Sequence, residues 1–139
     1  YMHLISNVSV TLIVGIPLEM LHGPWRVALI YVGSVLAGSL TGSIIMPNEF
    51  FVGASGGVFG VMGANLANFI LNWTLLQQNK RCFVALIIAN CVTFIFMTIY
   101  AVILNVPEFQ NVVHTVHMMG WTAGLILSLT LLRCFGKHR

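Results

Sequence analysis

Charged residues are scarce in this chain: only 6% of its 139 residues are Asp, Glu, Lys or Arg, while 58% are hydrophobic. Soluble domains carry about 25% charged residues, and their helices need a polar face that meets water. Here several apolar stretches run without a full charge for about 20 residues, the length that crosses the hydrocarbon core of a bilayer. The composition excludes a water-soluble domain and predicts an integral membrane protein.

The chain also lacks a basic run and a cysteine framework. Its six Lys and Arg residues are scattered over segment ends, so the net charge of +3 does not indicate nucleic-acid binding. Its three cysteines are odd in number and have no metal-like spacing, which makes them packing residues rather than a disulfide framework. The expected surroundings are therefore the lipid bilayer, with no nucleic-acid partner.

Five apolar segments can be drawn, joined by short connections that contain Gly, Pro and Asn. Short loops rich in Lys and Arg tend to stay on the cytoplasmic side, and here such loops alternate with loops that hold only Glu. The chain is therefore predicted to start outside and end inside, so that the first, third and fifth segments begin at the outer face. The predicted segments are 3–21, 25–46, 54–76, 82–104 and 112–134.

The third predicted segment opens with a serine flanked by glycines, Gly53-Ala54-Ser55-Gly56-Gly57. Polar groups within a bilayer are costly, so each is a functional candidate. Free amides at a helix N-terminus can stabilise a developing oxyanion beside such a hydroxyl. The alternative interpretation of Ser55 is a helix cap followed by packing glycines.

No aspartate occurs anywhere in the chain, which excludes a Ser-His-Asp triad and a pair of catalytic aspartates. A serine still needs a base, and His117 is the best candidate. His117 shares a helical face with Gly120 and Gly124, which suits close packing, and Phe59 follows Ser55 by one turn and is expected to stack on the imidazole. The alternatives are simple helix packing and a hydrogen-bonded core histidine. The residues predicted to support this Ser-His dyad are Gly53, Gly56, Phe59, Gly120 and Gly124.

Two further polar residues lie one turn apart at the outer end of the first segment, His3 and Asn7. Their i, i+4 spacing points their side chains in one direction, so they can complete an oxyanion site with the backbone amide of Ser55. Alone, the pair would be an unremarkable helix end. His114 and His117 could join a metal site, but no third ligand is evident and no cofactor is expected.

These motifs resemble the rhomboid family of intramembrane serine proteases. His3-x-x-x-Asn7, Gly53-Ala54-Ser55-Gly56 and His117-x-x-Gly120-x-x-x-Gly124 occur in the family's order and spacing. The stretch 15–27, GIPLEMLHGPWRV, resembles animal secretory-pathway members in particular. The resemblance covers essentially the whole chain and implies an all-α, polytopic transmembrane helical bundle.

By this resemblance Ser55 is the nucleophile, His117 the general base, and His3 with Asn7 the oxyanion-stabilising pair. The implied function is a serine endopeptidase that needs no cofactor and cuts single-pass transmembrane proteins near the outer membrane face. The implied location is the secretory pathway (Golgi) or the plasma membrane. The five segments resemble the second to sixth of six core helices, so residues 1–139 are expected to form a single rhomboid-like domain without the first helix and loop.

Two other classes of function stay open from the sequence. A catalytically silent or fragmentary relative that binds membrane clients usually loses the serine or the histidine, and both are present here. A piece of a channel or transporter would line a path across the membrane with polar groups, whereas here these groups cluster at one end.

Overall fold

The computed structural model describes residues 2–45, 47–48, 54–78, 81, 84–85, 87–88, 90–92, 95 and 110–135. Every element in this part of the chain is helical, which confirms the predicted all-α bundle. The helices are α1 (Met2–His22), α2 (Pro24–Ile45), α3 (Ala54–Leu71), the short α4 (Trp73–Gln78) and α6 (Gln110–Leu131).

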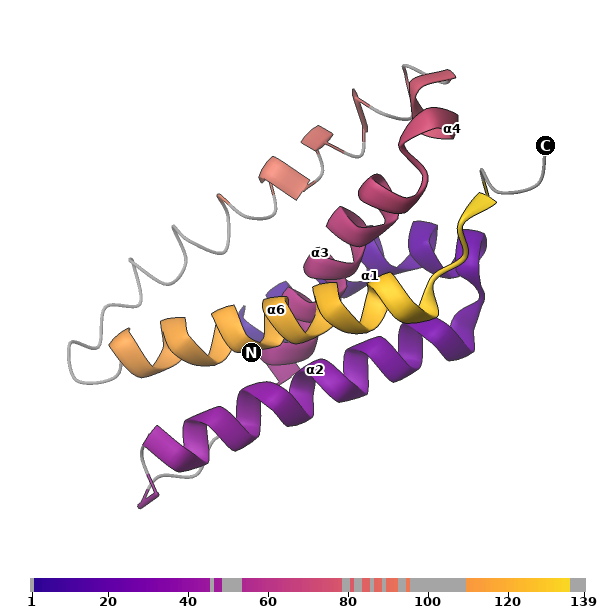
Figure 1. Ribbon diagram of the computed structural model, residues 1–139. Coiled ribbons are helices and arrows are strands. Elements are labelled where there is room, and N and C mark those ends of the chain that lie inside the picture. Colours follow the sequence, from indigo (N-terminus) through magenta and orange to yellow (C-terminus); the bar gives the residue numbers. More distant parts are fainter. Residues whose placement is uncertain are drawn as a thin grey trace.

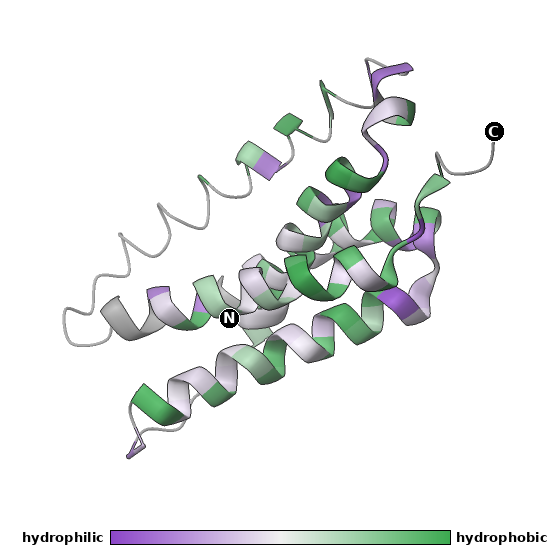
Figure 2. Ribbon diagram, viewed as in Figure 1, coloured by the Kyte–Doolittle hydropathy of each residue, from purple (hydrophilic) through white to green (hydrophobic). Residues whose placement is uncertain are grey.

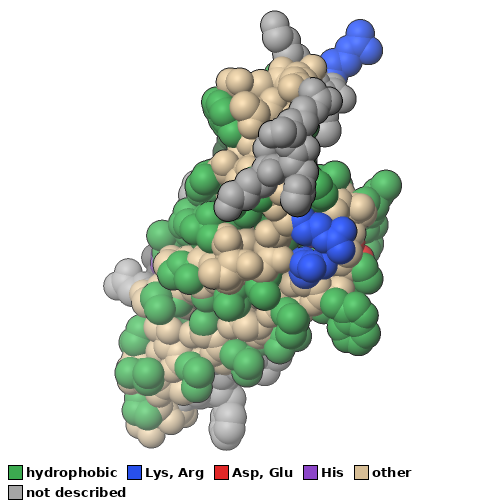
Figure 3. Space-filling view, turned by 45° about the vertical axis from the view of Figure 1, so that its right-hand side comes forward, with side chains coloured by type: hydrophobic (Ala, Val, Ile, Leu, Met, Phe, Trp, Pro, Cys, Tyr) green, Lys and Arg blue, Asp and Glu red, His purple; other side chains and the backbone are tan. Residues whose placement is uncertain are grey.

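Three of these helices are long and apolar enough to cross a membrane, over Leu4–His22, Pro24–Ile45 and Ala54–Leu71. Hydrophobic residues extend along the middle of the helices, while hydrophilic residues gather toward their ends (Figure 2). Large apolar side chains also cover the outer surface, and Met20, Trp25 and Ile44 are more than 80% exposed. Figure 3 shows such side chains spread over one face of the bundle. This distribution fits a lipid surrounding, because a polar solvent would select a polar outer face.

A glycine and a proline separate α1 from α2. Gly23 has φ of 91°, a conformation that favours glycine, and its N–H donates to the carbonyl oxygen of Glu19 at 2.8 Å. Pro24 then opens α2, where its missing N–H costs nothing because the first amides of a helix have no partner within it. The chain therefore reverses direction within one residue.

The third helix is shorter than the predicted segment 54–76. α3 ends at Leu71, Asn72 lies in a turn, and α4 continues from Trp73. At this turn the N–H of Leu75 donates to the carbonyl of Asn72, three residues back, at 3.1 Å, which departs from the four-residue repeat of an α-helix. Predicted segment 82–104 falls mostly outside the described residues, so its helix remains a prediction.

α3 is the central helix of the described bundle, and its most extensive contacts are with α6 (Figure 1). Gly56 contacts Gly120 and Gly60 contacts Gly124, so α3 and α6 run in the same direction. α1 also runs parallel to α3, since Val14 lies near Asn65 while His22 lies near Asn68. α2 runs the opposite way. The starts of α1, α3 and α6 thus lie at one end of the bundle, as the predicted topology requires.

Glycines, which have no side chain, allow α3 and α6 to approach closely. A Cβ atom added at Gly120 would lie 2.9 Å from the Cα of Gly56, and one added at Gly124 would collide with the backbone of Gly60. On the other side of α3, Ser34 of α2 occupies the space where a side chain of Gly60 would be. Such small residues let membrane helices pack by van der Waals contact where lipid offers no hydrophobic driving force.

Candidate active site

The ring of Phe59 stacks on the imidazole of His117 at the end of the bundle where α3 and α6 begin. The two ring centroids are 4.3 Å apart and the planes are inclined by 11°. This is the stacking that the spacing of Ser55 and Phe59 predicts. The contact limits the rotation of the imidazole and joins the first turns of α3 to α6.

Ser55 lies in the first turn of α3, one turn before Phe59 on the same helical face. Its side chain is largely enclosed, with 8% of the residue exposed. Because the first amides of a helix have no intrahelical partner, the backbone around Ser55 offers donors to a negatively charged oxygen. The position therefore combines a hydroxyl, nearby amides and, through Phe59, the imidazole of His117.

Gly56 and Gly120 bring this serine and this histidine toward one another. Gly56 directly follows Ser55, Gly120 lies one turn after His117, and the two glycine backbones are in contact. A side chain at Gly120 would push α6 away from α3, because its Cβ atom would lie 2.9 Å from the Cα of Gly56. The packing glycines thus set the separation of the two candidate catalytic residues as well as the stability of the bundle.

The predicted oxyanion pair is described only in part. Asn7 is buried in α1, and its backbone carbonyl accepts a hydrogen bond from the Thr11 hydroxyl at 2.8 Å. Since α1 and α3 are parallel and Gly15 faces Val61, Asn7 lies toward the same end of the bundle as Ser55. His3 belongs to α1, but its side chain and the whole of Gly53 lie outside the described residues. Their roles remain predictions.

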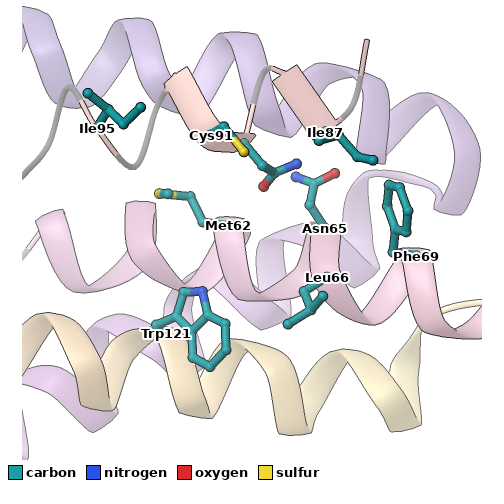
Figure 4. Close-up of a pocket in the computed structure, with 9 residues that line it drawn as sticks. Met62, Asn65, Leu66, Phe69, Ile87, Cys91, Ile95 and Trp121 are labelled. Carbon is teal, nitrogen blue, oxygen red and sulfur yellow. The ribbon is translucent and has the colours of Figure 1, made fainter. Parts of the chain in front are cut away.

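An apolar pocket of about 410 Å³ lies between α3 and the described residues of 87–95, and Trp121 is its lining residue from α6 (Figure 4). Met62 follows Phe59 by three residues and Trp121 follows His117 by four, so the pocket starts directly beyond this pair. Two asparagines, Asn65 and Asn90, are the polar residues of its wall. Asn65 is held in place by the carbonyl oxygens of Val61 and Val14, at 3.2 and 3.4 Å.

A second polar cluster, which the sequence did not predict as a unit, lies at the opposite end of the bundle. His22 of α1 is completely buried, and its Nε2 lies 2.9 Å from Oδ1 of Asn68 in α3. The backbone N–H of Arg133 donates to Nδ1 of His22 at 3.1 Å. Because a backbone N–H can only donate, Nδ1 is the acceptor and Nε2 carries the proton of a neutral ring.

Asn72 extends this cluster to the chain beyond α6. Its Nδ2 donates to Oδ1 of Asn68 at 2.9 Å, and its Oδ1 accepts from the backbone N–H of Phe135 at 2.7 Å. We call His22, Asn68, Asn72 and their backbone partners the polar knot. The signal in the sequence is the i, i+4 pair of asparagines within an apolar segment, which a hydrocarbon surrounding does not tolerate without partners.

Metal ligands do not gather in the described part of the chain, where no group of three His, Cys, Asp or Glu side chains could hold an ion. His114 is exposed one turn before His117. The chemistry that the geometry offers is therefore that of a hydroxyl, an imidazole and amide donors at one end of a membrane bundle.

Comparison with known proteins identifies relatives of this chain. The chain is 35% identical over 139 residues to the mouse protein Rhomboid-related protein 2, covering 97% of this chain and 45% of that protein. It is 36% identical over 140 residues to Rhomboid-related protein 1 of Caenorhabditis elegans, covering 99% of this chain and 38% of that protein. RHOMBOID-like protein 1 of Arabidopsis thaliana is 36% identical over 130 residues, which cover 94% of this chain and 31% of that protein.

The chain thus spans less than half the length of these relatives. No solved structure matches it significantly. The model of the rhomboid domain family matches residues 1–134, nearly the entire chain. This chain belongs to the rhomboid family.

Proposed function

We propose that this protein is an intramembrane serine endopeptidase that uses a Ser55–His117 dyad. The observation that carries the proposal is the stacking of Phe59 on His117, at a centroid distance of 4.3 Å, one turn from Ser55. In a chain without aspartate, a stacked aromatic ring can fix the orientation of the imidazole, which is one of the roles of the carboxylate in a triad. Membership of the rhomboid family supports the same chemistry.

In the proposed reaction the neutral imidazole of His117 accepts the hydroxyl proton of Ser55 while Oγ attacks the carbonyl carbon of the scissile peptide. The resulting oxyanion accepts hydrogen bonds from the Ser55 amide and from the side chains of His3 and Asn7. His117 then returns the proton to the leaving amine, and the peptide C–N bond breaks. Water deprotonated by His117 releases the acyl group and regenerates the hydroxyl.

The proposed substrates are single-pass transmembrane proteins cut near the outer or lumenal membrane face. Ser55, Asn7 and His117 belong to helix starts at one end of the bundle, so the scissile bond must reach that end. A substrate helix there has to unwind, which costs less where glycine and other weak helix formers occur. We place the protein in the secretory pathway (Golgi) or plasma membrane, and regard residues 1–139 as a single rhomboid-like membrane domain.

The test is labelling of the full-length protein, in detergent or liposomes, by a fluorophosphonate that reacts with activated serines. The parent protein is expected to be labelled, and Ser55→Ala to abolish labelling. Loss of a general base is expected to reduce the labelling rate of His117→Ala by about 10²- to 10⁴-fold. Cleavage of a reporter transmembrane segment should fall in parallel.

Cys91→Ala is a suitable control, because Cys91 is an exposed nucleophile outside the proposed dyad. Its labelling should equal that of the parent protein. Equal labelling of the parent, Ser55→Ala and His117→Ala would rule out the dyad. Complete absence of labelling and cleavage in a correctly folded parent protein would instead favour the alternative, a catalytically silent relative that binds membrane clients.

A further inference from the structure

The ring of Tyr31 in α2 lies against the turn of α3 that carries Ser55. A Cβ atom added at Gly57 would lie 2.6 Å from Cε2 and 2.7 Å from Cζ of Tyr31. Atoms of two side chains do not approach that closely, so the tyrosine ring occupies the space that a side chain at position 57 would need. Tyr31 and Gly57 are therefore a matched pair across the α2–α3 interface.

The hydroxyl of the same side chain reaches the residue before Ser55. Tyr31 Oη lies 3.4 Å from the carbonyl oxygen of Ala54, which it can approach as a donor. This length is at the weak end of hydrogen bonding, so the hydroxyl adds a small contribution to the ring contact. Together, ring and hydroxyl contact α3 on both sides of Ser55 in the sequence.

Neighbouring contacts make α2 a continuous support for this turn. The backbone carbonyl of Ser34, one turn after Tyr31, would lie 3.3 Å from a Cβ added at Gly56. α6 contacts Gly56 from its own side through Gly120. The first turn of α3 is thus enclosed between α2 and α6, and Tyr31 extends the α2 contact to Ala54, where the helix begins.

We propose that Tyr31 is a positioning residue for Ser55: its ring, seated on Gly57, holds the first turn of α3 at the separation from His117 that proton transfer requires. The inference rests on the proposed dyad. A first helical turn is the part of a helix most prone to fraying, because half of its hydrogen bonds are missing. Displacement of a reacting group by about 1 Å can cost about 10²-fold in rate.

Three variants of the full-length protein separate the ring from the hydroxyl. Tyr31→Phe keeps the ring and is expected to label with fluorophosphonate within about threefold of the parent rate, since a weak neutral hydrogen bond contributes little. Tyr31→Leu loses the ring, and its limiting labelling rate is expected to fall by roughly 10- to 100-fold. The apparent affinity for the fluorophosphonate and the pH at which the rate is half-maximal should stay unchanged, because the reagent's contacts and His117 remain.

A double-mutant cycle tests the contact itself. Gly57→Ala places a methyl group into the tyrosine ring and is expected to slow labelling by about tenfold or more. Tyr31→Ala removes that ring. Cγ2 of Val35 also lies 2.7 Å from the added Cβ atom. The labelling rate of the double variant is therefore expected to recover only in part from the loss caused by Gly57→Ala. If the two residues act through one contact, the double variant is no slower than the slower single variant.

Val32→Ala is the matched control, because Val32 neighbours Tyr31 in α2 but is 54% exposed. Its labelling rate should equal the parent rate. The positioning role would be overturned if the losses in labelling rate of the two single variants multiplied in the double variant, or if Tyr31→Leu labelled as fast as Tyr31→Phe. Labelling of Ser55 in the parent protein would still support the dyad in either case. Parallel thermal unfolding measurements identify a variant that merely fails to fold. If Tyr31→Leu fails to fold, Gly57→Ala still tests the ring contact, and a folded Gly57→Ala variant that labels at the parent rate would overturn the positioning role.

Discussion

At the scale of single residues, the imidazole of His117 depends on an aromatic neighbour for its orientation. The stacked Phe59 ring, inclined by only 11°, fills the face of the imidazole and leaves its nitrogen atoms at the edge, where a serine hydroxyl can reach one of them. Stacking of this kind contributes about 0.5–1.5 kcal/mol. Stacking therefore contributes little to the free energy of unfolding, but it acts directly on the geometry of proton transfer.

Replacement of Phe59 by leucine should therefore slow the proposed catalysis without unfolding the protein. Loss of stacking worth about 1 kcal/mol corresponds to a roughly fivefold lower rate of Ser55 labelling. Phe59→Tyr keeps the ring and should label within about twofold of the parent protein. Labelling kinetics of the three proteins measure the effect, and a Phe59→Leu variant as fast as the parent would show that the ring does not orient the imidazole.

At the scale of helices, the contact of α3 with α6 is made by backbone against backbone. Gly56 with Gly120, and Gly60 with Gly124, repeat this contact one helical turn apart. Backbone atoms cannot rotate away as a side chain can, so the helices have one permitted separation. Gly33 of α2 differs, because an added Cβ there meets the far end of the Leu127 side chain, at 2.6 Å.

These two kinds of glycine should respond differently to alanine. Gly120→Ala is expected to destabilise the protein by about 1–3 kcal/mol, because the helices must separate. In Gly33→Ala the flexible Leu127 can move, and the gain in helix propensity of up to about 1 kcal/mol offsets the remaining crowding. Unfolding in detergent measures both variants, and equal destabilisation would contradict the difference between backbone and side-chain contact.

At the scale of the whole molecule, the glycine contacts and the polar knot fix the helices at different heights of the bundle. The glycines set the separation of α3 and α6 near the proposed dyad. The polar knot holds the chain after α6 to α1 and α3 at the opposite end, through Arg133 on His22 and Phe135 on Asn72. The buried hydrogen bonds that join His22, Asn68 and Asn72 specify one arrangement, because a buried polar group without a partner is costly.

Removal of the polar knot should destabilise the end of the bundle opposite the proposed dyad, without a large effect on the reactivity of Ser55. Asn72→Leu takes a hydrogen-bond partner from the Phe135 amide and from the Arg133 carbonyl, whereas Oδ1 of Asn68 keeps its bond to His22. Each group left unsatisfied costs about 1–3 kcal/mol. Faster amide exchange over residues 132–135 and a lower unfolding temperature are expected, with Ser55 labelling within about threefold of the parent rate.

The matched control for the knot is Ser43→Ala, which deletes an exposed hydrogen bond within α2, 3.0 Å long, and should leave stability nearly unchanged. If Asn72→Leu had the same unfolding temperature and amide exchange rates as Ser43→Ala, the polar knot would contribute nothing to the packing of the helices. A loss of Ser55 labelling as large as that of His117→Ala would show instead that the two ends of the bundle are coupled.

The sequence by itself determined that the chain is helical and membrane-embedded, because long uncharged apolar stretches leave no other way to satisfy the backbone in lipid. It also determined which residues could carry chemistry, since Ser55, His117, His3 and Asn7 are few and their spacing is characteristic. The glycines of α3 and α6 indicated close packing because their spacing follows the helical repeat.

Only the tertiary structure decided which groups meet across helices. The seating of Tyr31 on Gly57 and the bonds of His22 to Asn68 and Arg133 join residues that no periodicity links, because they depend on the rotation and offset of one helix against another. The hydrogen bond from the Asn72 side chain to the carbonyl of Arg133 has the same origin. Local composition sets which helices form, whereas contacts between distant segments set where each side chain is placed.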